Sequence, residues 1–504
     1  MSDVQSESAG KPSEGGKLAG GRLNAIVIVF LVMAIVAPIG GASGPVSLGI
    51  ALGNGAGMPG AFLIAMVILL CFAAGYAAMS RRVTETGAFY AYITRGLGRP
   101  TGGAGAMVAM LAYNAAFCAM CGYIGFFAKM FVLEHAGLDL PWYVYTAIVL
   151  VIIFILGRLN ISIGAGVLVV LLTLELCLFV VFDIGVLVKY GIGAFSLTPF
   201  TPHTVWTGGW GGFSVAMMFA VFCFGGVEAA AIYSEEARNP ARTVGRATFG
   251  AVLAVGIFYV LTSWCLVTVA GYGDAQKAAL ANPGGFGFDM LGQVLGSSAA
   301  VIMNVLVITS ILASMTGLHQ EIARYGLALA RDGLLPRSLA RVHPVSKAPT
   351  VASAAALGLA IVVCLVFILA GADPLMTLAA SLSGLTTIGT LILWAVASLA
   401  FVVYFRRHAD LRWITTLVLP VISFVAMGVL LYLGVSRYSM VTGVPTAWIN
   451  NLQWLFVPFI LLGVGLMLYK KYTKPDAYAL IWPDKPDEGA PAGPILAAQM
   501  EVTR

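Results

Sequence analysis

Twelve long apolar runs alternate with short polar segments along the chain. They lie near residues 24–51, 60–79, 105–132, 141–157, 163–189, 212–234, 248–271, 295–324, 351–370, 377–405, 413–435 and 454–472. About 20 apolar residues cross the hydrocarbon core of a bilayer as a helix, so each run is long enough to span it or nearly so. The pattern predicts an all-α integral membrane protein with twelve transmembrane helices.

The composition agrees with this interpretation. The 504 residues are 60% hydrophobic and 10% charged, and the mean hydropathy is +0.94. Soluble domains carry roughly 25% charged residues. The composition therefore excludes an ordinary soluble domain.

The basic residues predict the orientation, because cytoplasmic segments retain lysine and arginine. With a cytoplasmic N-terminus and twelve crossings, 24 of the 28 basic residues fall on the cytoplasmic side. The four outside are Lys129, Lys189, Lys277 and Arg437. We therefore expect both termini in the cytoplasm and the chain in the cell membrane. The net charge of +6 follows from this topology and indicates no nucleic-acid partner.

Two runs contain residues that weaken a helix near the middle of the bilayer. The first run carries the cluster from Pro38 to Pro45, and the sixth carries Gly225 and Gly226 before Glu228. Unwound backbone in a membrane is tolerated only where it lines a cavity. Close helix packing is the alternative reading of either cluster. Paired breaks at matching positions of two inverted repeats, spans 1–5 and 6–10, point to a transporter binding site.

Acidic residues inside apolar runs are functional candidates, because burying a carboxylate in a membrane is costly. Glu175 lies roughly 18 Å from the inner end of the fifth run, and Glu228 lies one turn past the sixth-run break. Each could instead serve only to join neighbouring helices. Asp183 lies near the outer surface, where a hydrated or capping role is expected. Asp289 and Glu321 lie near run ends and are expected to be solvated.

The seven cysteines all fall within apolar runs. Disulfides are therefore not expected. Cys118 and Cys121 have C-x-x-C spacing but lack a second Cys or His pair, which favours packing over metal binding. We expect no metal and no cofactor.

Four segments together resemble the amino acid, polyamine and organocation transporter superfamily. The longest is VFCFGGVEAAAIYSEEARNPARTVGRA at 221–247, and the others lie at 79–98, 323–336 and 40–44. The resemblance implies a leucine-transporter-like fold with two inverted five-helix repeats, broken helices 1 and 6, and alternating access. It implies a transport core at 23–405 and helices 11 and 12 at 406–472. Residues 1–22 and 473–504 are expected to be cytoplasmic tails, the first disordered and the second mostly so.

The resemblance also implies a substrate site at the two breaks. Backbone amides of Gly41, Ala42 and Ser43 would hold a substrate carboxylate, and carbonyls of Ile39, Phe222 and Gly225 would hold its amine. Phe222 would also serve as an aromatic gate. The implied site includes their neighbours Gly40, Gly44 and Cys223. Relatives often have an apolar pair where Pro45 follows Gly44 here, so a register shift of one to three residues stays open.

Certain relatives carry a lysine in helix 5 that matches Glu175 in this chain. The opposite charge suits a proton carrier or a partner for a substrate amine, and we assign Glu175 and Glu228 to proton coupling. In the following loop, Glu235, Glu236, Arg238 and Arg242 could form an ion-pair network that closes an inner gate with Arg81 and Arg82. A solvated loop is the alternative.

The motifs argue against an enzyme. No HExxH or GxSxG pattern occurs, and GNGAG at 53–57 lies in an outer loop rather than after a strand. The sequence predicts an importer of amino acids driven by proton symport. The alternatives are an importer of polyamines or small amines, an exchanger, or a substrate-sensing receptor on the same fold.

Overall fold

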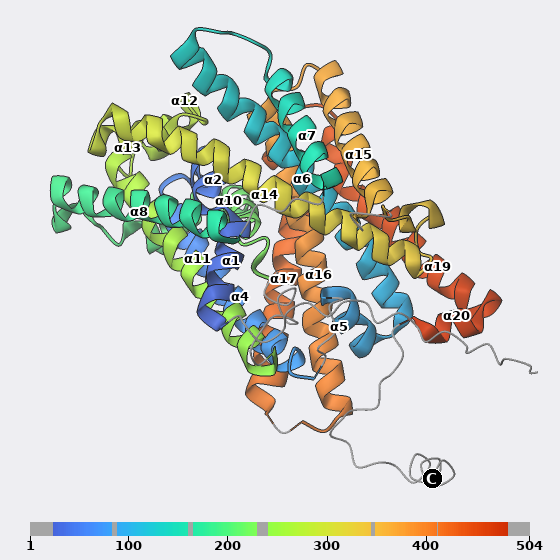
Figure 1. The fold of residues 1–504 in the computed structure, drawn as a ribbon. Coiled ribbons are helices and arrows are strands. Elements are labelled where there is room, and N and C mark those ends of the chain that lie inside the picture. Colours follow the sequence, from blue (N-terminus) through green and yellow to red (C-terminus); the bar gives the residue numbers. More distant parts are fainter. Residues whose placement is uncertain are drawn as a thin grey trace, which may run out of the picture.

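The computed structural model describes residues 24–82, 88–159, 165–228, 240–343, 348–410 and 412–481. All regular structure in these residues is helical (Figure 1). Ten helical segments there are long and apolar enough to cross a membrane. Two shorter apolar helices, Trp142–Arg158 and Gly209–Phe222, occupy the positions of the fourth and sixth runs. The chain is thus a multi-pass helical membrane protein, and the count of twelve crossings stays a prediction.

The helices follow the apolar runs in order. The N-terminal half contains α1 (Ala25–Val36), α2 (Pro38–Ser43), α3 (Pro45–Leu48), α4 (Met58–Met79), α5 (Ala88–Leu97), α6 (Arg99–Ala136), α7 (Trp142–Leu159), α8 (Ala165–Tyr190), α9 (Pro202–Val205) and α10 (Gly209–Phe222). The remainder contains α11 (Pro240–Ala270), α12 (Ala275–Ala281), α13 (Phe286–Leu295), α14 (Ser297–Arg331), α15 (Thr350–Leu369), α16 (Ala380–Arg407), α17 (Leu419–Ser436), α18 (Tyr438–Thr442), α19 (Phe456–Thr473) and α20 (Pro475–Leu480). Short π-helical and 3-10 segments join several of these helices.

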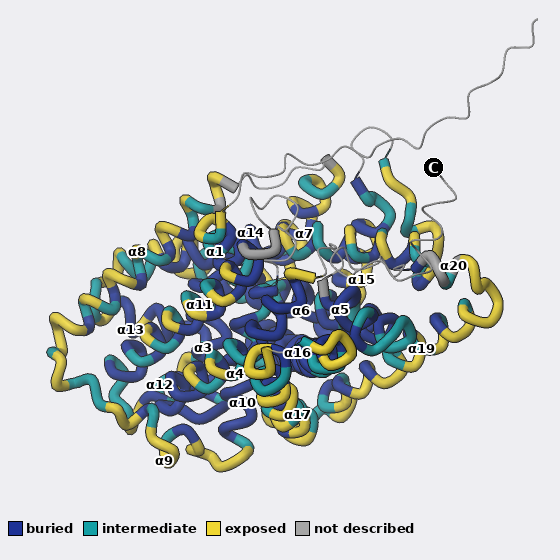
Figure 2. The backbone as a smooth tube through the Cα atoms, turned by 90° about the horizontal axis from the view of Figure 1, so that it is seen from below, coloured by how far each residue is buried: buried dark blue, intermediate teal, exposed yellow. Residues whose placement is uncertain are grey.

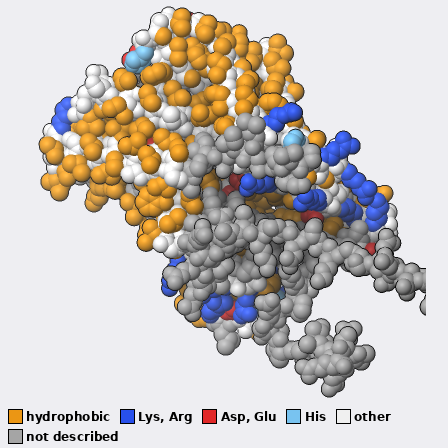
Figure 3. All heavy atoms as spheres, viewed as in Figure 1, with side chains coloured by type: hydrophobic (Ala, Val, Ile, Leu, Met, Phe, Trp, Pro, Cys, Tyr) orange, Lys and Arg blue, Asp and Glu red, His pale blue; other side chains and the backbone are white. Residues whose placement is uncertain are grey.

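Burial divides the bundle into an interior and a lipid-facing exterior. The buried positions gather at α3, α6 and α16, whereas the peripheral helices and loops are exposed (Figure 2). The exposed positions of α8, α15 and α17 include many large apolar side chains, and Figure 3 shows one broad surface covered by such side chains. An apolar exterior of this extent is the expected surface of a protein solvated by lipid.

The first apolar run is interrupted as the sequence predicts. Helix α1 ends at Val36, and Ala37 takes a left-handed backbone conformation with φ of 53° before α2 begins at Pro38. A positive φ is unusual for a residue with a side chain. A second interruption lies at Gly44, after which Pro45 begins α3. The main break therefore precedes the Pro38–Pro45 cluster instead of lying inside it.

The sixth run is interrupted after Phe222. Residues 223–226 form turns, and Gly226 has φ of 100°, a conformation that favours glycine. The Gly225 amide donates to the Phe222 carbonyl across this turn at 2.9 Å. The predicted break in the sixth run is therefore present in the structure.

The C-terminal end of the described chain packs against the ends of three earlier helices. The Arg99 guanidinium donates from Nε to the Ile481 carbonyl at 2.7 Å and lies 5.1 Å from the centre of the Tyr478 ring. Ile481 is 4% exposed, in a small apolar cluster separate from the main core that includes Tyr90 and Leu329. The segment after α19 thereby contacts the ends of α5, α6 and α14.

Candidate functional site

The two helix breaks lie against each other. A Cβ atom placed on Gly226 would lie 3.2 Å from Cγ2 of Ile35 and 3.7 Å from Cγ2 of Val36. Ile35 and Val36 are the last residues of α1, so irregular backbone from the first and sixth runs meets at one place. This is the arrangement expected if the breaks form one site and do not serve two separate helix contacts.

The break in the first run is held by the buried carboxylate of Glu175 on α8. The first amide of α2 belongs to Ile39, because Pro38 has no N–H. That amide donates to Oε2 of Glu175 at 3.4 Å, and the Glu175 residue is 3% exposed. Ser310 on α14 is buried near the same carboxylate. Glu175 is thus joined to the break itself, which the fifth-run position alone did not indicate.

Helix α14 also holds the other side of this break. The Ser314 hydroxyl donates to the Ile35 carbonyl at 2.9 Å. Since the last carbonyls of a helix have no partner within it, this bond satisfies one group that the end of α1 leaves open. Ser310 lies one turn before Ser314 on the same face of α14, and this face packs beside the break.

The break in the sixth run is held mainly by its own neighbour. The Gly226 amide donates to Oε2 of Glu228 at 3.1 Å, and Glu228 is 7% exposed. The Tyr76 hydroxyl on α4 donates to the Glu228 carbonyl at 3.0 Å. Glu228 therefore braces the unwound turn through both its carboxylate and its backbone.

Some of the backbone groups expected to bind substrate already form hydrogen bonds within the protein. The Gly41 amide donates to the Ala37 carbonyl at 3.0 Å, and Ala42 and Ser43 follow within α2. The first amides of α2, at Ile39 and Gly40, lie two residues earlier, which is within the register shift that the sequence leaves open. The use of any of these groups by a substrate stays a prediction.

Side-chain packing explains two of the glycines. A Cβ on Gly41 would overlap the Tyr259 hydroxyl on α11, and one on Gly44 would lie 2.6 Å from Cε1 of Tyr123 on α6. The Ile39 carbonyl accepts the Ser43 hydroxyl at 2.8 Å. Gly41 and Gly44 are thus needed for close approach by aromatic side chains of neighbouring helices, which adds a packing role to the predicted one.

Phe222 and Cys223 end the α10 half of the site. Phe222 is half-buried against the core, and Cys223 is buried in it. Tyr259 contacts the first break at Gly41, and its hydroxyl is buried without a hydrogen-bond partner in the described structure. Its aromatic ring also stacks on Phe62 at 4.9 Å between centroids.

Sequence reasoning did not assign Ser310, Ser314, Tyr76 or Tyr259 to the site. Ser310 and Ser314 stand four residues apart and so share a helix face, and a search for polar residues at this spacing would have found them. The interpretation of Asp183 also differs. Its Oδ1 is buried without a hydrogen-bond partner in the described structure.

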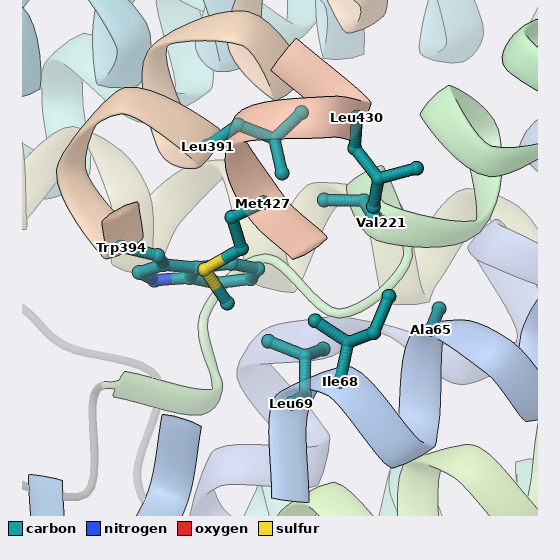
Figure 4. Close-up of a pocket in the computed structure, with 8 residues that line it drawn as sticks. All are labelled: Ala65, Ile68, Leu69, Val221, Leu391, Trp394, Met427 and Leu430. Carbon is teal, nitrogen blue, oxygen red and sulfur yellow. The ribbon is translucent and has the colours of Figure 1, made fainter. Parts of the chain in front are cut away.

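A small empty space next to α10 does not belong to the polar site. It is a narrow gap with no room for a water molecule, lined by Ala65, Ile68, Leu69, Val221, Leu391, Trp394, Met427 and Leu430 (Figure 4). These side chains come from α4, α10, α16 and α17 and are apolar apart from the Trp394 indole N–H. The space offers no group that would bind a charged substrate.

Two other sequence expectations concern metals and the inner gate. No group of three or more His, Cys, Asp or Glu side chains suited to a metal ion occurs among the residues that the structure describes. The gate residues Glu235, Glu236 and Arg238 lie outside the described residues, as does the Arg242 side chain, while Arg81 and Arg82 are exposed at the end of α4.

The paired breaks within a multi-pass apolar bundle define a membrane transport protein. The fold is similar to that of the manganese transporter of Eremococcus coleocola, whose crystal structure superimposes with a TM-score of 0.54 at 15% identity, covering 90% of this chain and 97% of that one. The chain belongs to the amino acid permease family, whose family model matches residues 21–466.

Two bacterial relatives illustrate the range within this similarity. The branched-chain amino acid permease BcaP of Bacillus subtilis is 27% identical over 83% of this chain and 86% of its own length. The methylthioribose transporter of the same organism is 27% identical over 52% of this chain, and the match spans half of that protein's length. The match to the family thus extends over most of this chain, whereas the names of the relatives indicate different substrates.

Proposed function

We propose that this protein imports an amino acid across the cell membrane by proton symport. The observation that carries the proposal is the meeting of two helix breaks around a buried carboxylate. The name of BcaP, a branched-chain amino acid permease that matches most of the chain, supports an amino acid as the substrate. Alternating access by two inverted five-helix repeats, with both termini in the cytoplasm, belongs to the same proposal.

The proposed substrate site lies at the paired breaks. It comprises Ile39, Gly40, Gly41, Ala42, Ser43 and Gly44 from the first run and Phe222, Cys223 and Gly225 from the sixth. Amides near the start of α2 bind the carboxylate, and carbonyls at the two breaks bind the amine. Phe222, at the end of α10, covers the bound substrate.

Proton coupling is assigned to Glu175 and Glu228, because each carboxylate bonds to a backbone amide at a break. In the empty carrier, an ionised Glu175 accepts a hydrogen bond from the Ile39 amide and so fixes the backbone at the break. When the carboxylate gains a proton, its hold on that amide weakens and the break is released for the substrate. Proton binding and substrate binding then favour each other, which is the requirement for symport.

An importer of small amines is the second candidate, and one observation favours it. Two buried carboxylates, Glu175 and Glu228, lie at the breaks, and the described structure shows no lysine or arginine in an ion pair with either. A cationic substrate would offset this negative charge. A zwitterion would do so only through its ammonium group.

The first experiment identifies the substrate and separates transport from sensing. Purified protein in proteoliposomes is tested for counterflow of radiolabelled leucine, lysine, putrescine and methylthioribose. Exchange of leucine supports the proposal, exchange of putrescine alone supports the amine importer, and binding without flux indicates a receptor. Acceleration of net uptake by an alkaline interior tests the proton as coupling ion.

The Glu175→Gln variant tests the coupling residue. Glutamine keeps an acceptor for the Ile39 amide but carries no charge, so counterflow should stay close to that of the wild type while accumulation driven by a pH gradient is lost. Asp289→Asn is the matched control, because Asp289 is an exposed acid whose carboxylate accepts a hydrogen bond from Asn282 at 2.9 Å. Equal accumulation by the wild type and Glu175→Gln would exclude the coupling role.

A further inference from the structure

The C-terminal end of the described chain belongs to an apolar cluster at one end of the bundle. Residues 475–481, which include α20, are called the C-terminal strap below; they follow α19 at the edge of the molecule (Figure 1). Ile481, the last of them, is 4% exposed. It is buried in one cluster with Tyr90 of α5, Leu329 of α14 and Met467 of α19. The C-terminal strap thus lies where these helix ends meet.

Polar contacts fix the C-terminal strap at the same place. Nε of Arg99, in the first turn of α6, donates to the Ile481 carbonyl at 2.7 Å, and the guanidinium lies 5.1 Å from the centre of the Tyr478 ring. The Lys470 ammonium, near the end of α19, donates to the Asp332 carbonyl just after α14. Hydrogen bonds from a charged donor are stronger than those between neutral groups. The end of α6 is therefore joined to the C-terminal strap, and the end of α14 to α19.

Helix α14 connects this cluster to the break in the first run. It continues without interruption from Ser297 to Arg331. Its Ser314 hydroxyl donates to the Ile35 carbonyl at the end of α1 at 2.9 Å. Leu329, in the cluster, lies about 22 Å further along the same helix axis. A rigid helix carries a displacement of one end to the other. A restraint on the Leu329 end of α14 therefore acts on the end of α1.

The cluster lies on the cytoplasmic side under the proposed orientation. Opening of a carrier of this kind toward the cytoplasm requires one group of helices to move against the other. A movement of α14 away from α6 would separate Arg99 from Ile481, because these residues join the two helix ends through the C-terminal strap. Two conformations of one protein usually differ little in free energy, so a contact of this size shifts their populations.

We propose that the C-terminal strap is an autoinhibitory contact that slows the opening of the carrier toward the cytoplasm. When docked, it holds the inner end of α14 beside α5 and α6, and α14 holds the end of α1 through Ser314. When it detaches, the inner end of α14 moves more freely and the hold of Ser314 on the first break weakens. This inference rests on the alternating access and orientation of the proposed function, but on no particular substrate or coupling ion.

The test compares the full-length wild type with two variants that weaken the docked state and with one control. Arg99→Lys keeps the positive charge that the topology uses but replaces the planar guanidinium by a flexible ammonium. Ile481→Asp places a carboxylate in the apolar cluster. Asp476→Asn is the control, because Asp476 lies in the same segment and is exposed.

Two measurements are made on these proteins. Hydrogen exchange by mass spectrometry should be faster in the C-terminal strap of both variants, and also at residues 33–41 around the first break. Exchange in the turn at 223–226 should stay unchanged. Counterflow of radiolabelled leucine in proteoliposomes should rise about fivefold, the shift that loss of one typical hydrogen bond gives. The control should match the wild type in both measurements.

The outcomes separate this inference from the function on which it rests. Faster exchange confined to the C-terminal strap, with unchanged counterflow, would make it a local packing element and overturn the proposal. Slower counterflow at an unchanged midpoint of thermal unfolding would also overturn it, since the segment would then promote transport. A wild type without leucine counterflow contradicts the proposed amino acid transport, and exchange at the first break then decides the inference alone. If Ile481→Asp does not fold, Arg99→Lys decides, because Arg99 is only partly buried.

Discussion

The two helix breaks are held by contacts of different range. The break in the first run depends on side chains far away in the sequence, since Glu175 lies 136 residues from Ile39 and Ser314 lies 279 residues from Ile35. In the break of the sixth run, the Gly226 amide bonds to Glu228 two residues along the chain. The first break therefore responds to movement of α8 or α14, whereas the second keeps part of its shape by itself.

The largest expected effect is at Gly41, where the first break packs most tightly. Gly41→Val would push a side chain into the Tyr259 hydroxyl and so disturb the first break. Overpacking of this kind costs about 1–3 kcal/mol or more. We expect a clear fall in the midpoint of thermal unfolding in detergent, together with loss of counterflow.

Tyr259→Phe provides the control for that variant. If the Tyr259 hydroxyl is the obstacle, the double variant Gly41→Ala with Tyr259→Phe should be more stable than Gly41→Ala alone. Equal stability of these two proteins would show that Gly41 is needed for another reason, such as the approach of substrate.

The next effect is at Glu175, on which the first break depends. Glu175→Leu leaves the buried Ile39 amide without its acceptor, which costs about 1–3 kcal/mol. Thermal unfolding should begin at a lower temperature, and transport should be lost. Glu175→Gln keeps an acceptor and should retain most of the stability, so a similar loss in both variants would contradict the bracing contact.

A smaller loss of stability is expected when the hydrogen bond between Glu228 and the Gly226 amide is removed. Glu228→Ala removes the acceptor of the Gly226 amide, at a cost of about 1 kcal/mol. The Tyr76 hydroxyl still bonds to the backbone carbonyl of residue 228. Hydrogen exchange measured by mass spectrometry should therefore show faster exchange limited to the turn after α10. Spread of the effect to α1 would show that the second break is not held locally.

Ser314→Ala should give the smallest change at either break. The serine donates one hydrogen bond to the Ile35 carbonyl, and such side-chain bonds in membrane proteins contribute about 0.6 kcal/mol on average. The thermal midpoint should fall slightly, and counterflow should persist at a reduced rate. Thr309→Ala is the matched control, because the Thr309 hydroxyl bonds to carbonyls of its own helix.

The reference point away from both breaks is Asp410, between α16 and α17. The Arg412 guanidinium, 2.6 Å away, lowers the pKa of this carboxyl below its usual value of 3.8. The contact therefore stabilises the protein above that pH, and the effect disappears as the pH falls through the lower folded value. Asp410→Asn should cost at most about 1 kcal/mol near neutral pH, as for an exposed ion pair, and should leave transport unchanged.

The sequence predicted the location of both breaks but not their partners. Pro38 and the glycines beside it indicate a weak helix through their own backbone chemistry, and the pair at 225 and 226 does the same. The contact of Glu175 with Ile39 depends on how α8 packs against α2, which no local pattern reports. The donors assigned to the substrate carboxylate begin two residues after the first amide of α2, within the register shift that the resemblance leaves open beside Pro45.

The interpretation of the acidic residues shows the same limit. The depth of Glu175 follows from counting residues along an apolar run, and the structure places it in the interior. Glu321 was treated as solvated because it lies near the end of its run. The structure places it half-buried, one turn before Tyr325, whose ring packs on Tyr113 of α6. A one-dimensional count of depth could not predict this packing.

The contact between Arg99 and Ile481 has a consequence for the synthesis of the chain. The two residues are separated by 382 positions, so the apolar cluster around Tyr90 and Leu329 lacks Ile481 until the ribosome has reached that residue. At 5–20 residues per second, roughly 20–80 s pass between the synthesis of Arg99 and that of Ile481. During this interval the first helices are inserted while the ends of α5, α6 and α14 lack their contact with Ile481. That contact forms only when the final residues of the described chain have been made.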